Sequence, residues 1–501
     1  MRNPAFDTAH APLWTAQPTV ARSALNDVLV VALLAMGGWL AAGDWLGALA
    51  AAVLWMIWRL LTVNGAPPVL FWAMSFEWLQ VTIGMFYYGL TGRVLPTIQL
   101  SNYRPMVLIG LICVAALAVG LRLGIQSHRW AARAAERPPH AHILLTWRFL
   151  LTWFLAATAL GGTLQQFAVQ YPALIQPVFA LTSLRLGLLF LILRRLMRPR
   201  FRTGPLVALL ALETVLGFTG FFAGFKEPLM LALMALFEQF DRRRARHWIA
   251  VVLIVTVGIM AGVVWLGVRR TYRGDYAQYT SRTQRLERLV SLTAVWWNRN
   301  ESAPLATVDQ LVERIWAVYY PALAYAHVPA VVPHTNGALL EAAVLQAIEP
   351  RLLFPNKPDV PSDSEKVRKY SGIYVAGAES NTSIAFGYAA ESYVDFGTPV
   401  MFLPVLVFGF LMGIAFSWFQ TNIRYIELAT ALLTVVFWLS LYLFEKSWPF
   451  LIGQAGTRLL YLGAATWLVD RYLYARREDR DRASAMPGLR GPTYRFPGSA
   501  S

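Results

Sequence analysis

Long apolar runs fill most of this chain and are separated by short polar segments. A helix needs about 20 apolar residues to cross roughly 30 Å of hydrocarbon, and twelve runs approach that length, although the first and eighth are short. The predicted spans are residues 28–43, 45–63, 69–90, 105–125, 147–168, 173–193, 205–222, 226–240, 248–268, 398–419, 424–444 and 449–469. The pattern therefore predicts an all-α polytopic integral membrane protein with about 12 transmembrane helices.

The pattern changes between the ninth and tenth spans, where residues 269–397 are of mixed polarity. Residues 282–297 and 307–327 carry apolar positions at helical spacing, and Ser362 with Glu365 matches the capping box that begins a helix. A polar backbone of this length has to be satisfied by water or by other protein. We therefore predict a large helical loop that forms a cap outside the membrane.

Basic residues indicate which side of the membrane each loop occupies, because short loops rich in Lys and Arg stay in the cytoplasm. Twelve alternating spans with the N-terminus inside place the clusters around Arg133, Arg195, Arg243 and Arg476 on one side. The large loop then faces outward, and both termini are cytoplasmic.

This orientation divides the chain into five parts. They are a cytoplasmic N-terminal segment (1–27), an N-terminal bundle of about nine spans (28–268), the extracytoplasmic loop (269–397), about three C-terminal spans (398–469) and a cytoplasmic tail (470–501). The tail is charged and then rich in Gly, Pro and Ser, which predicts disorder. The expected location is the cytoplasmic (inner) membrane of a bacterium.

Composition agrees with this picture and excludes other classes of protein. Hydrophobic residues make up 57% of the chain and charged residues only 14%, which differs strongly from the typical composition of soluble domains. The net charge of +16 is concentrated in short loops, so it indicates topology and not nucleic-acid binding. Cys113 is the single cysteine, which excludes an intrachain disulfide and a cysteine metal cluster. We expect neither a metal nor a cofactor.

Short motifs follow one another in the loop and the next span. Pro350-Arg351 and Lys357-Pro358 lie in the loop, Glu391-Ser392-Tyr393-Val394-Asp395-Phe396-Gly397 returns the chain to the membrane, and Gly409 and Gly413 follow. In this order the set resembles the Wzy-type O-antigen and exopolysaccharide polymerases, the oligosaccharide repeat unit polymerases. Gly220 and Gly224 with Lys226 loosely resemble that family's glycine-plus-basic position before the loop.

The resemblance implies an integral-membrane glycosyltransferase of cell-envelope polysaccharide biosynthesis. Members of the family transfer a growing glycan from one polyprenyl pyrophosphate, such as undecaprenyl pyrophosphate, to the sugar of another on the outer face of the membrane. The implied partners are polyprenyl-pyrophosphate-linked oligosaccharides and membrane lipid, with a chain-length regulator and a flippase acting beside the polymerase.

Basic side chains suit this chemistry, since a pyrophosphate leaving group needs cationic stabilisation more than a general acid. Arg269, Arg270 and Arg273 lie at the outer end of the ninth span, and Arg351 and Lys357 can reach the same layer from the loop. Lys226 is a further candidate headgroup ligand. The alternative is that basic residues at the end of a span extend to lipid headgroups.

The acceptor hydroxyl loses a proton as it attacks, so a carboxylate is expected as general base. Glu391 and Asp395 are the candidates; they are four residues apart, which places them on one face of a helix with Tyr393 beside them as a substrate contact. The alternative is an interfacial helix start, where acids favour the helix dipole and aromatics the headgroup layer.

Two other functions remain open from the sequence. A ligase that moves finished glycan to a different acceptor would share this architecture. A non-enzymatic transporter or flippase of lipid-linked sugars would instead need a polar path through the membrane and two related halves, and the chain shows no clear internal repeat.

Overall fold

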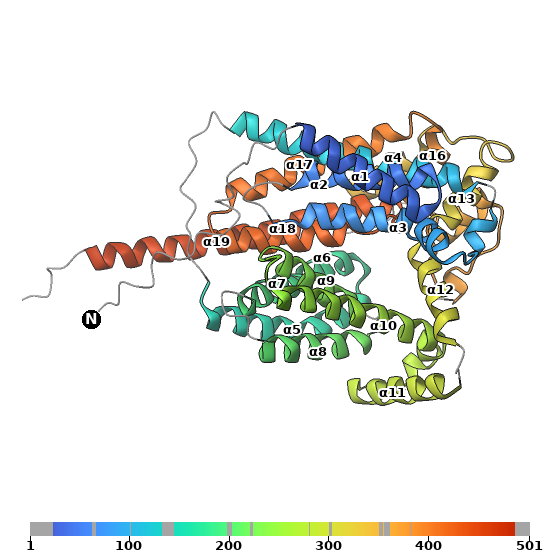
Figure 1. Ribbon diagram of the computed structural model, residues 1–501. Helices are drawn as coiled ribbons and strands as arrows, with labels where there is room; N and C mark the ends of the chain where they lie inside the picture. The colour runs from blue at the N-terminus through green and yellow to red at the C-terminus, as the bar shows by residue number, and fades with distance from the viewer. Residues whose placement is uncertain are drawn as a thin grey trace, which may run out of the picture.

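The computed structural model describes residues 24–62, 67–100, 102–132, 145–197, 203–220, 224–279, 281–299, 303–349, 354, 361–380 and 382–485. Figure 1 shows a bundle of roughly aligned helices with shorter helices gathered at one end. The described residues contain no β-strand, so the predicted all-α class is confirmed for them.

Every predicted span coincides with a helix or a pair of helices. They are α1 (Ala24–Ala42), α2 (Trp45–Leu61), α3 (Val69–Thr91), α4 (Tyr103–Ala132), α5 (Trp147–Gln170), α6 (Pro172–Thr182) with α7 (Leu184–Leu196), α8 (Thr203–Phe218), α9 (Lys226–Phe237), α10 (Ala245–Asp275), α17 (Phe402–Asn422), α18 (Ile426–Leu441) and α19 (Trp448–Ala485). The predicted sixth span is divided at Ser183, whose N–H bonds to the carbonyls of both Phe179 and Ala180.

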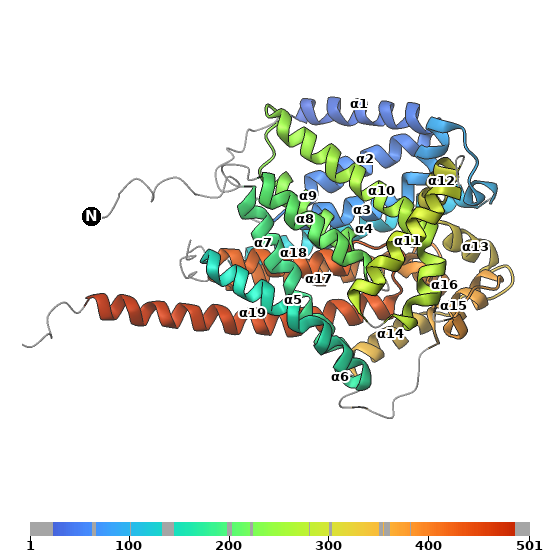
Figure 2. The same cartoon turned by 90° about the horizontal axis from the view of Figure 1, so that it is seen from below.

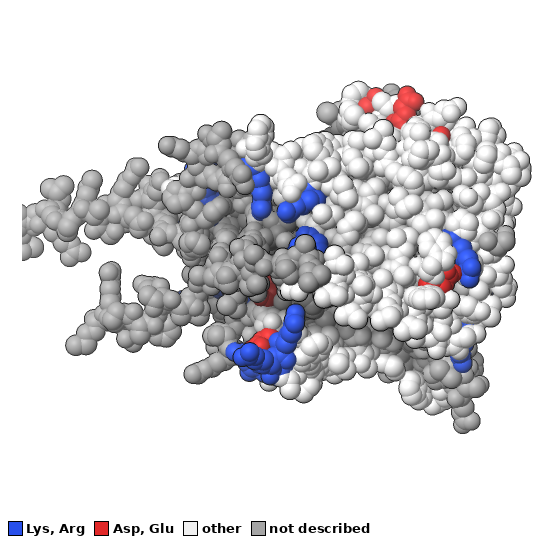
Figure 3. All heavy atoms as spheres, turned by 45° about the horizontal axis from the view of Figure 1, so that its top comes forward, with Lys and Arg blue, Asp and Glu red and all other residues white. Residues whose placement is uncertain are grey.

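Five helical segments in the described part of the chain are long and apolar enough to cross a membrane. They are Val69–Thr91, Tyr103–Trp130, Leu174–Leu196, Ala245–Asp275 and Phe402–Asn422. The chain is therefore compatible with a membrane protein, while the count of twelve spans remains a prediction. Figure 3 agrees, because one face shows a broad uncharged surface with most of its visible basic side chains toward one end.

Helices α4 and α17 form the closest pair in the bundle, and small residues explain the approach. A Cβ on Gly124 would lie 2.0 Å from the Phe410 carbonyl oxygen, and one on Gly413 would lie 2.2 Å from the Leu121 carbonyl oxygen. Gly120 and Gly409 face the partner backbone in the same way. Glycines four apart on both helices let the backbones touch, as at membrane helix interfaces generally.

The mixed-polarity insert folds into short helices beyond the end of α10. They are α11 (Arg282–Arg299), α12 (Ala303–Ile315), α13 (Tyr319–His327), α14 (Ala338–Ile348), α15 (Asp363–Ser371) and α16 (Gly387–Phe396). In Figures 1 and 2 the helices α12 to α16 gather at the end of the bundle opposite the C-terminal end of α19; we call them the cap. The predicted capping box of Ser362 and Glu365 is confirmed at the start of α15.

Two boundaries differ from the prediction. The segment 307–327 is divided between α12 and α13 because Trp316 turns inward and its indole N–H bonds to the Val81 carbonyl of α3. The tail was predicted to be disordered from residue 470, but α19 continues to Ala485. Residues 471–485 contain no glycine or proline and many good helix formers, which permits this extension. The rest of the tail lies outside the described residues.

Candidate functional site

The motif Glu391 to Gly397 forms the helix α16 and the turn that ends it. Gly387 and Gly397, at its two ends, adopt φ angles of +90° and +63°, which favour glycine. Glu391 and Asp395 are completely buried, and Tyr393 is 7% exposed. The predicted catalytic motif therefore lies inside the protein.

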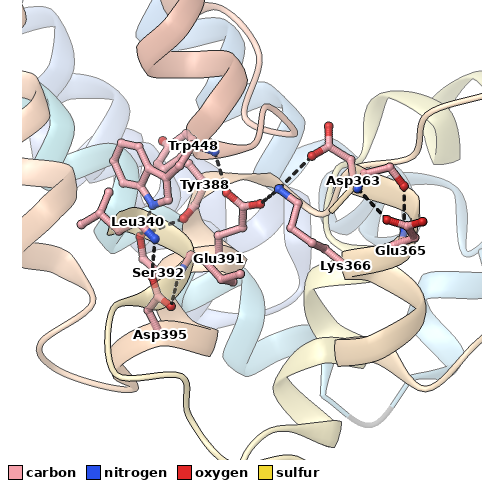
Figure 4. A network of polar contacts seen from close by, with 11 residues as sticks. Leu340, Asp363, Glu365, Lys366, Tyr388, Glu391, Ser392, Asp395 and Trp448 are labelled. Carbon is pink, nitrogen blue, oxygen red and sulfur yellow. Dashed lines mark hydrogen bonds and ion pairs between the residues drawn. The ribbon is translucent and has the colours of Figure 1, made fainter. Parts of the chain in front are cut away.

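The Glu391 carboxylate joins three parts of the structure. The Lys366 ammonium of α15 donates to its Oε1, and the backbone N–H of Trp448, at the start of α19, donates to its Oε2 at 2.6 Å. Lys366 also pairs with Asp363 at 2.9 Å, and Figure 4 shows Lys366 between the two carboxylates. Burial opposes the charged ammonium of Lys366, but the two carboxylates outweigh it and raise its pKa.

Asp395 holds the beginning of α14 and does not face solvent. Its carboxylate accepts hydrogen bonds from the backbone N–H groups of Leu339 (3.0 Å) and Leu340 (2.8 Å) and from the Thr335 hydroxyl. A carboxylate at a helix N-terminus satisfies unpaired N–H groups and favours the helix dipole. An acidic side chain of the motif therefore does act on a helix dipole, as in the alternative interpretation of the sequence. The helix concerned is α14 and not α16.

Tyr393 also has a structural environment. Its hydroxyl donates to the Val328 carbonyl at 3.0 Å, and its ring packs against Tyr325 and His334 with centroids 5.0 Å and 5.6 Å away. In this arrangement Glu391, Asp395 and Tyr393 have their polar atoms engaged by protein. Neither carboxylate is accessible to accept a proton from a sugar hydroxyl.

Helix α16 instead fixes the loop between α18 and α19, residues 442–447. The Tyr388 N–H donates to the Lys446 carbonyl at 2.6 Å, and the Trp448 indole N–H donates to the Ser392 hydroxyl at 2.9 Å. A Cβ on Gly387 would lie 2.5 Å from the Phe444 carbonyl oxygen, so only glycine permits this approach. The motif therefore determines where Glu445 and Lys446 lie.

Cations from five parts of the chain surround this loop, and we call them the cationic cluster. They are Lys226 of α9, Arg269 and Arg273 of α10, Arg314 of α12, Lys446 of the loop and Arg458 of α19. The Arg314 guanidinium binds both oxygens of Glu445, at 2.7 Å and 3.0 Å. Arg269 and Arg273 lie near enough to Arg314 for their like charges to repel it.

The other half of the cluster is organised around Tyr442. The ammonium groups of Lys226 and Lys446 lie 5.3 Å and 5.2 Å from the centre of its ring. Lys446 and Arg458 both donate to the Leu439 carbonyl, so these two cations are neighbours. Cations near an aromatic face are stabilised without being neutralised.

The cluster has an excess of positive charge. Glu77, Glu227 and Glu445 also act electrostatically on its cations. Six cations and three carboxylates leave a formal excess of three positive charges among these nine groups. Burial, with repulsion from Arg458, lowers the pKa of Lys446 well below its ordinary value, whereas Glu445 raises the pKa of Arg314. Such a site favours an anion of several negative charges.

Solvent reaches part of the cluster. The Arg314 side chain is 53% exposed and that of Glu445 is 31% exposed, and Lys226 is also exposed. Glu445 is therefore a carboxylate of this region that a substrate can reach, and Glu227 is also partly exposed.

The predicted site residues divide into four groups. Lys226, Arg269 and Arg273 lie in the cationic cluster, and Arg270 is exposed on α10. Glu391, Asp395 and Tyr393 are buried on α16, where their polar atoms bond to neighbouring helices and loops. Arg351 and Lys357 lie outside the described residues. Sequence reasoning missed Lys366 and Arg314 as partners, because their carboxylates are 25 and 131 residues away along the chain.

In the described part of the chain, no group of three or more His, Cys, Asp or Glu side chains is placed to hold a metal ion. The fold and the site thus define an all-helical, membrane-compatible protein with a cationic cluster at the cap end of its bundle. Residues 107–432 match a family described as Domain of unknown function (DUF8712), and the chain belongs to this family. No curated protein and no solved structure matches the chain significantly.

Proposed function

We propose that this protein is an integral-membrane glycosyltransferase that polymerises lipid-linked oligosaccharide repeat units in cell-surface polysaccharide biosynthesis. The observation that supports the proposal is the cationic cluster, which gathers an excess of positive charge where the bundle meets the cap. A polyprenyl pyrophosphate carries its negative charge at this level of a bilayer, because its lipid chain lies in the hydrocarbon and its sugar lies in water.

The chemistry needs few protein groups. The bond between the donor sugar and the pyrophosphate oxygen breaks, and its electron pair stays on that oxygen. The acceptor hydroxyl oxygen forms the new glycosidic bond and releases its proton. Arg269, Arg273 and Arg314 stabilise the negative charge that develops on the leaving pyrophosphate, and fixed cations in a partly dry site do this well.

Glu445 is the general base of this proposal. It lies among the cations, its side chain is partly exposed, and both of its oxygens are oriented by Arg314. Glu391 has an indirect part, because it holds the Trp448 backbone that follows Glu445 and Lys446. Arg351 and Lys357 remain proposed ligands of the glycan or pyrophosphate from the loop.

The proposed setting is the bacterial cytoplasmic membrane, with the cap outside and a flippase supplying the lipid-linked repeats. A chain-length regulator would act beside the enzyme. No nucleotide sugar is needed, since the donor is already activated by pyrophosphate.

The test uses the purified protein in nanodiscs with polyprenyl-pyrophosphate-linked repeat units, and it measures the rate at which longer glycans form. Arg314→Ala should lower that rate on the order of 10²-fold, as loss of one oxyanion ligand does in other enzymes. Glu445→Gln should lower it while donor binding is retained. Arg243→Ala, on an exposed arginine in the turn between α9 and α10, is the matched control and should retain the wild-type rate.

Absence of polymer with the wild-type protein would reject the function, and a wild-type rate for Arg314→Ala would reject the site. A deletion strain separates the alternatives in cells. Loss of a polymerase leaves single repeat units exposed outside, whereas loss of a flippase leaves them inside. Transfer only to an acceptor that lacks polyprenyl pyrophosphate would identify a ligase.

A further inference from the structure

We propose that residues 289–298 of α11 lie against the acyl chains of the bilayer leaflet on the cap side, with the N-terminal half of the helix at the headgroups. The sequence predicts this segment as part of a cap in water, so the inference changes its environment. It holds whether or not the protein joins sugars.

The helix has two chemically different halves. Arg285, Glu287 and Arg288 lie in the first half, no residue from Leu289 to Asn298 is ionisable, and Arg299 ends the helix. In this second half Val290, Val295 and Trp297 are 60%, 46% and 58% exposed. Val290 and Trp297, seven residues apart, share one face of the helix, and Val295 is exposed on another; exposed apolar side chains of this kind indicate contact with another apolar phase.

The charged half is fixed at the end of α10. The Arg288 guanidinium binds Asp275 at 2.6 Å, and the Arg285 guanidinium donates to the Tyr276 hydroxyl and to the Tyr279 carbonyl, both at 2.9 Å. These bonds satisfy the charges of the turn, which lies where the predicted ninth span meets the headgroup layer.

The uncharged half runs back along α10 toward the middle of the bundle. Trp296 packs on Gly267, where a Cβ would lie 2.4 Å from the indole nitrogen. Trp296 is eight residues after Arg288, and Gly267 is eight residues before Asp275. At 1.5 Å per residue both helices therefore descend about 12 Å from the charged turn. Figure 1 shows α11 at the outer edge of the molecule, beside the end of α10.

Helix α10 continues the same apolar surface below α11. It is one of the helices long and apolar enough to cross a membrane, and Val257, Ile259 and Met260 are exposed on it. Leu289, Val290, Thr293, Ala294, Trp297 and Asn298 line a shallow, open stretch of the α11 surface that is almost entirely apolar. An acyl chain can lie along such a surface.

The test places a nitroxide spin label on single-cysteine variants of the full-length protein in phosphatidylglycerol and phosphatidylethanolamine nanodiscs. The native Cys113 is fully buried, so the unmodified chain serves as the labelling blank. The variants are Val290→Cys, Val295→Cys and Trp297→Cys, with Glu287→Cys as the control on the charged half and Ile259→Cys as the lipid reference. Frequent collision of the label with dissolved oxygen indicates that it lies in lipid. Frequent collision with a water-soluble nickel chelate indicates that it lies in water.

The three variants of the uncharged half should give an oxygen-to-nickel collision ratio several-fold above that of Glu287→Cys and close to that of Ile259→Cys. A ratio equal to that of Glu287→Cys would overturn the proposal and place α11 in water. Low collision with both reagents would overturn it as well, because the face would then be covered by protein such as a second copy of the chain. Because three positions are labelled and two reference sites are measured, one variant that folds poorly does not decide the result.

Discussion

At the residue scale, burial decides which carboxylates could meet a substrate. Glu391 is enclosed with Lys366 and Trp448, and Asp395 is enclosed with the N-terminus of α14. Glu445 is held by Arg314 yet remains partly exposed. The acidic motif that the sequence singled out therefore acts, in this arrangement, on the position of its neighbours.

Glu391→Leu should destabilise the protein by about 3–5 kcal/mol, because the Lys366 ammonium would remain buried with only Asp363 beside it. The double variant Glu391→Leu with Lys366→Met should recover part of this loss, since it buries no unpaired ammonium, while Asp363 loses its partner. Unfolding in detergent, followed by circular dichroism, measures both. Equal instability of the single and double variants would contradict the ion-pair account.

The same pair predicts a dependence on alkaline pH. Although burial acts against it, the pKa of Lys366 is raised above the ordinary 10.5. A raised folded-state pKa gives stability that is complete below the unfolded-state pKa and is lost as pH rises through the folded-state pKa. Burial raises the pKa of Glu391, which adds its own change at lower pH, whereas the contribution of Lys366 to the difference in unfolding temperature between wild type and the double variant should be lost only above about pH 10.5. A change that is complete near neutral pH would contradict this assignment.

At the scale of the elements, contact between backbones holds α4 against α17. Four glycines permit it, and two of them, Gly409 and Gly413, were noted in the sequence only as part of a family resemblance. The structure supplies a packing reason for these positions that requires no role in catalysis. A glycine has the same role on helix α16, because Gly387 lets the backbone of the loop that carries Glu445 pack directly against the helix.

Gly124→Ala should destabilise the protein by about 1–3 kcal/mol, because the new methyl group meets the Phe410 carbonyl and the two helices have to separate. Gly161→Ala on α5 is the matched control, since nothing lies within 4 Å of its added Cβ. That control should be neutral or stabilising by up to about 1 kcal/mol through helix propensity. Thermal unfolding of the two variants in one detergent compares them, and equal effects would show that the α4–α17 contact is loose.

At the scale of the whole molecule, the cap lies at one end of a bundle, and the face seen in Figure 3 is broadly uncharged. The cationic cluster belongs to α9, α10, α12, α19 and the loop before α19. The predicted topology places that end outside the cell, where lipid-linked repeat units would arrive. The long helix α19 leaves the bundle at the other end and continues its regular structure to Ala485.

Cysteine labelling in cells tests this orientation. Val331 lies in the cap and is 69% exposed. The variant Val331→Cys should therefore react with a membrane-impermeant maleimide on intact spheroplasts. Arg243→Cys, in the exposed turn between α9 and α10, should react only after the membrane is opened. The positive-inside rule is the physical reason for the difference. Reversed labelling would invert the topology and place the cationic cluster in the cytoplasm.

Much of the fold was accessible to sequence reasoning, because each predicted span coincides with a helix or a helix pair. The spacing of apolar residues predicts which segments become helical, and this prediction does not require knowing which helices pack together. The break at Trp316 was missed because it depends on a contact with α3. For the site, the clusters of Arg269 and Arg273 and of Lys226 were found, whereas Arg314 and Lys366 carried no local signal.

Local composition and spacing are enough to predict the helical class, the apolar runs compatible with a membrane and the position of the mixed-polarity insert. Which of the charged residues are accessible depends on how the helices pack. Glu391 is buried because Lys366 and Trp448 come to it from other helices, and Glu445 becomes central because Arg314 binds it while Lys226 and Lys446 lie beside the nearby Tyr442. Pairing across such separations is a property of packing, and one-dimensional periodicity does not encode it.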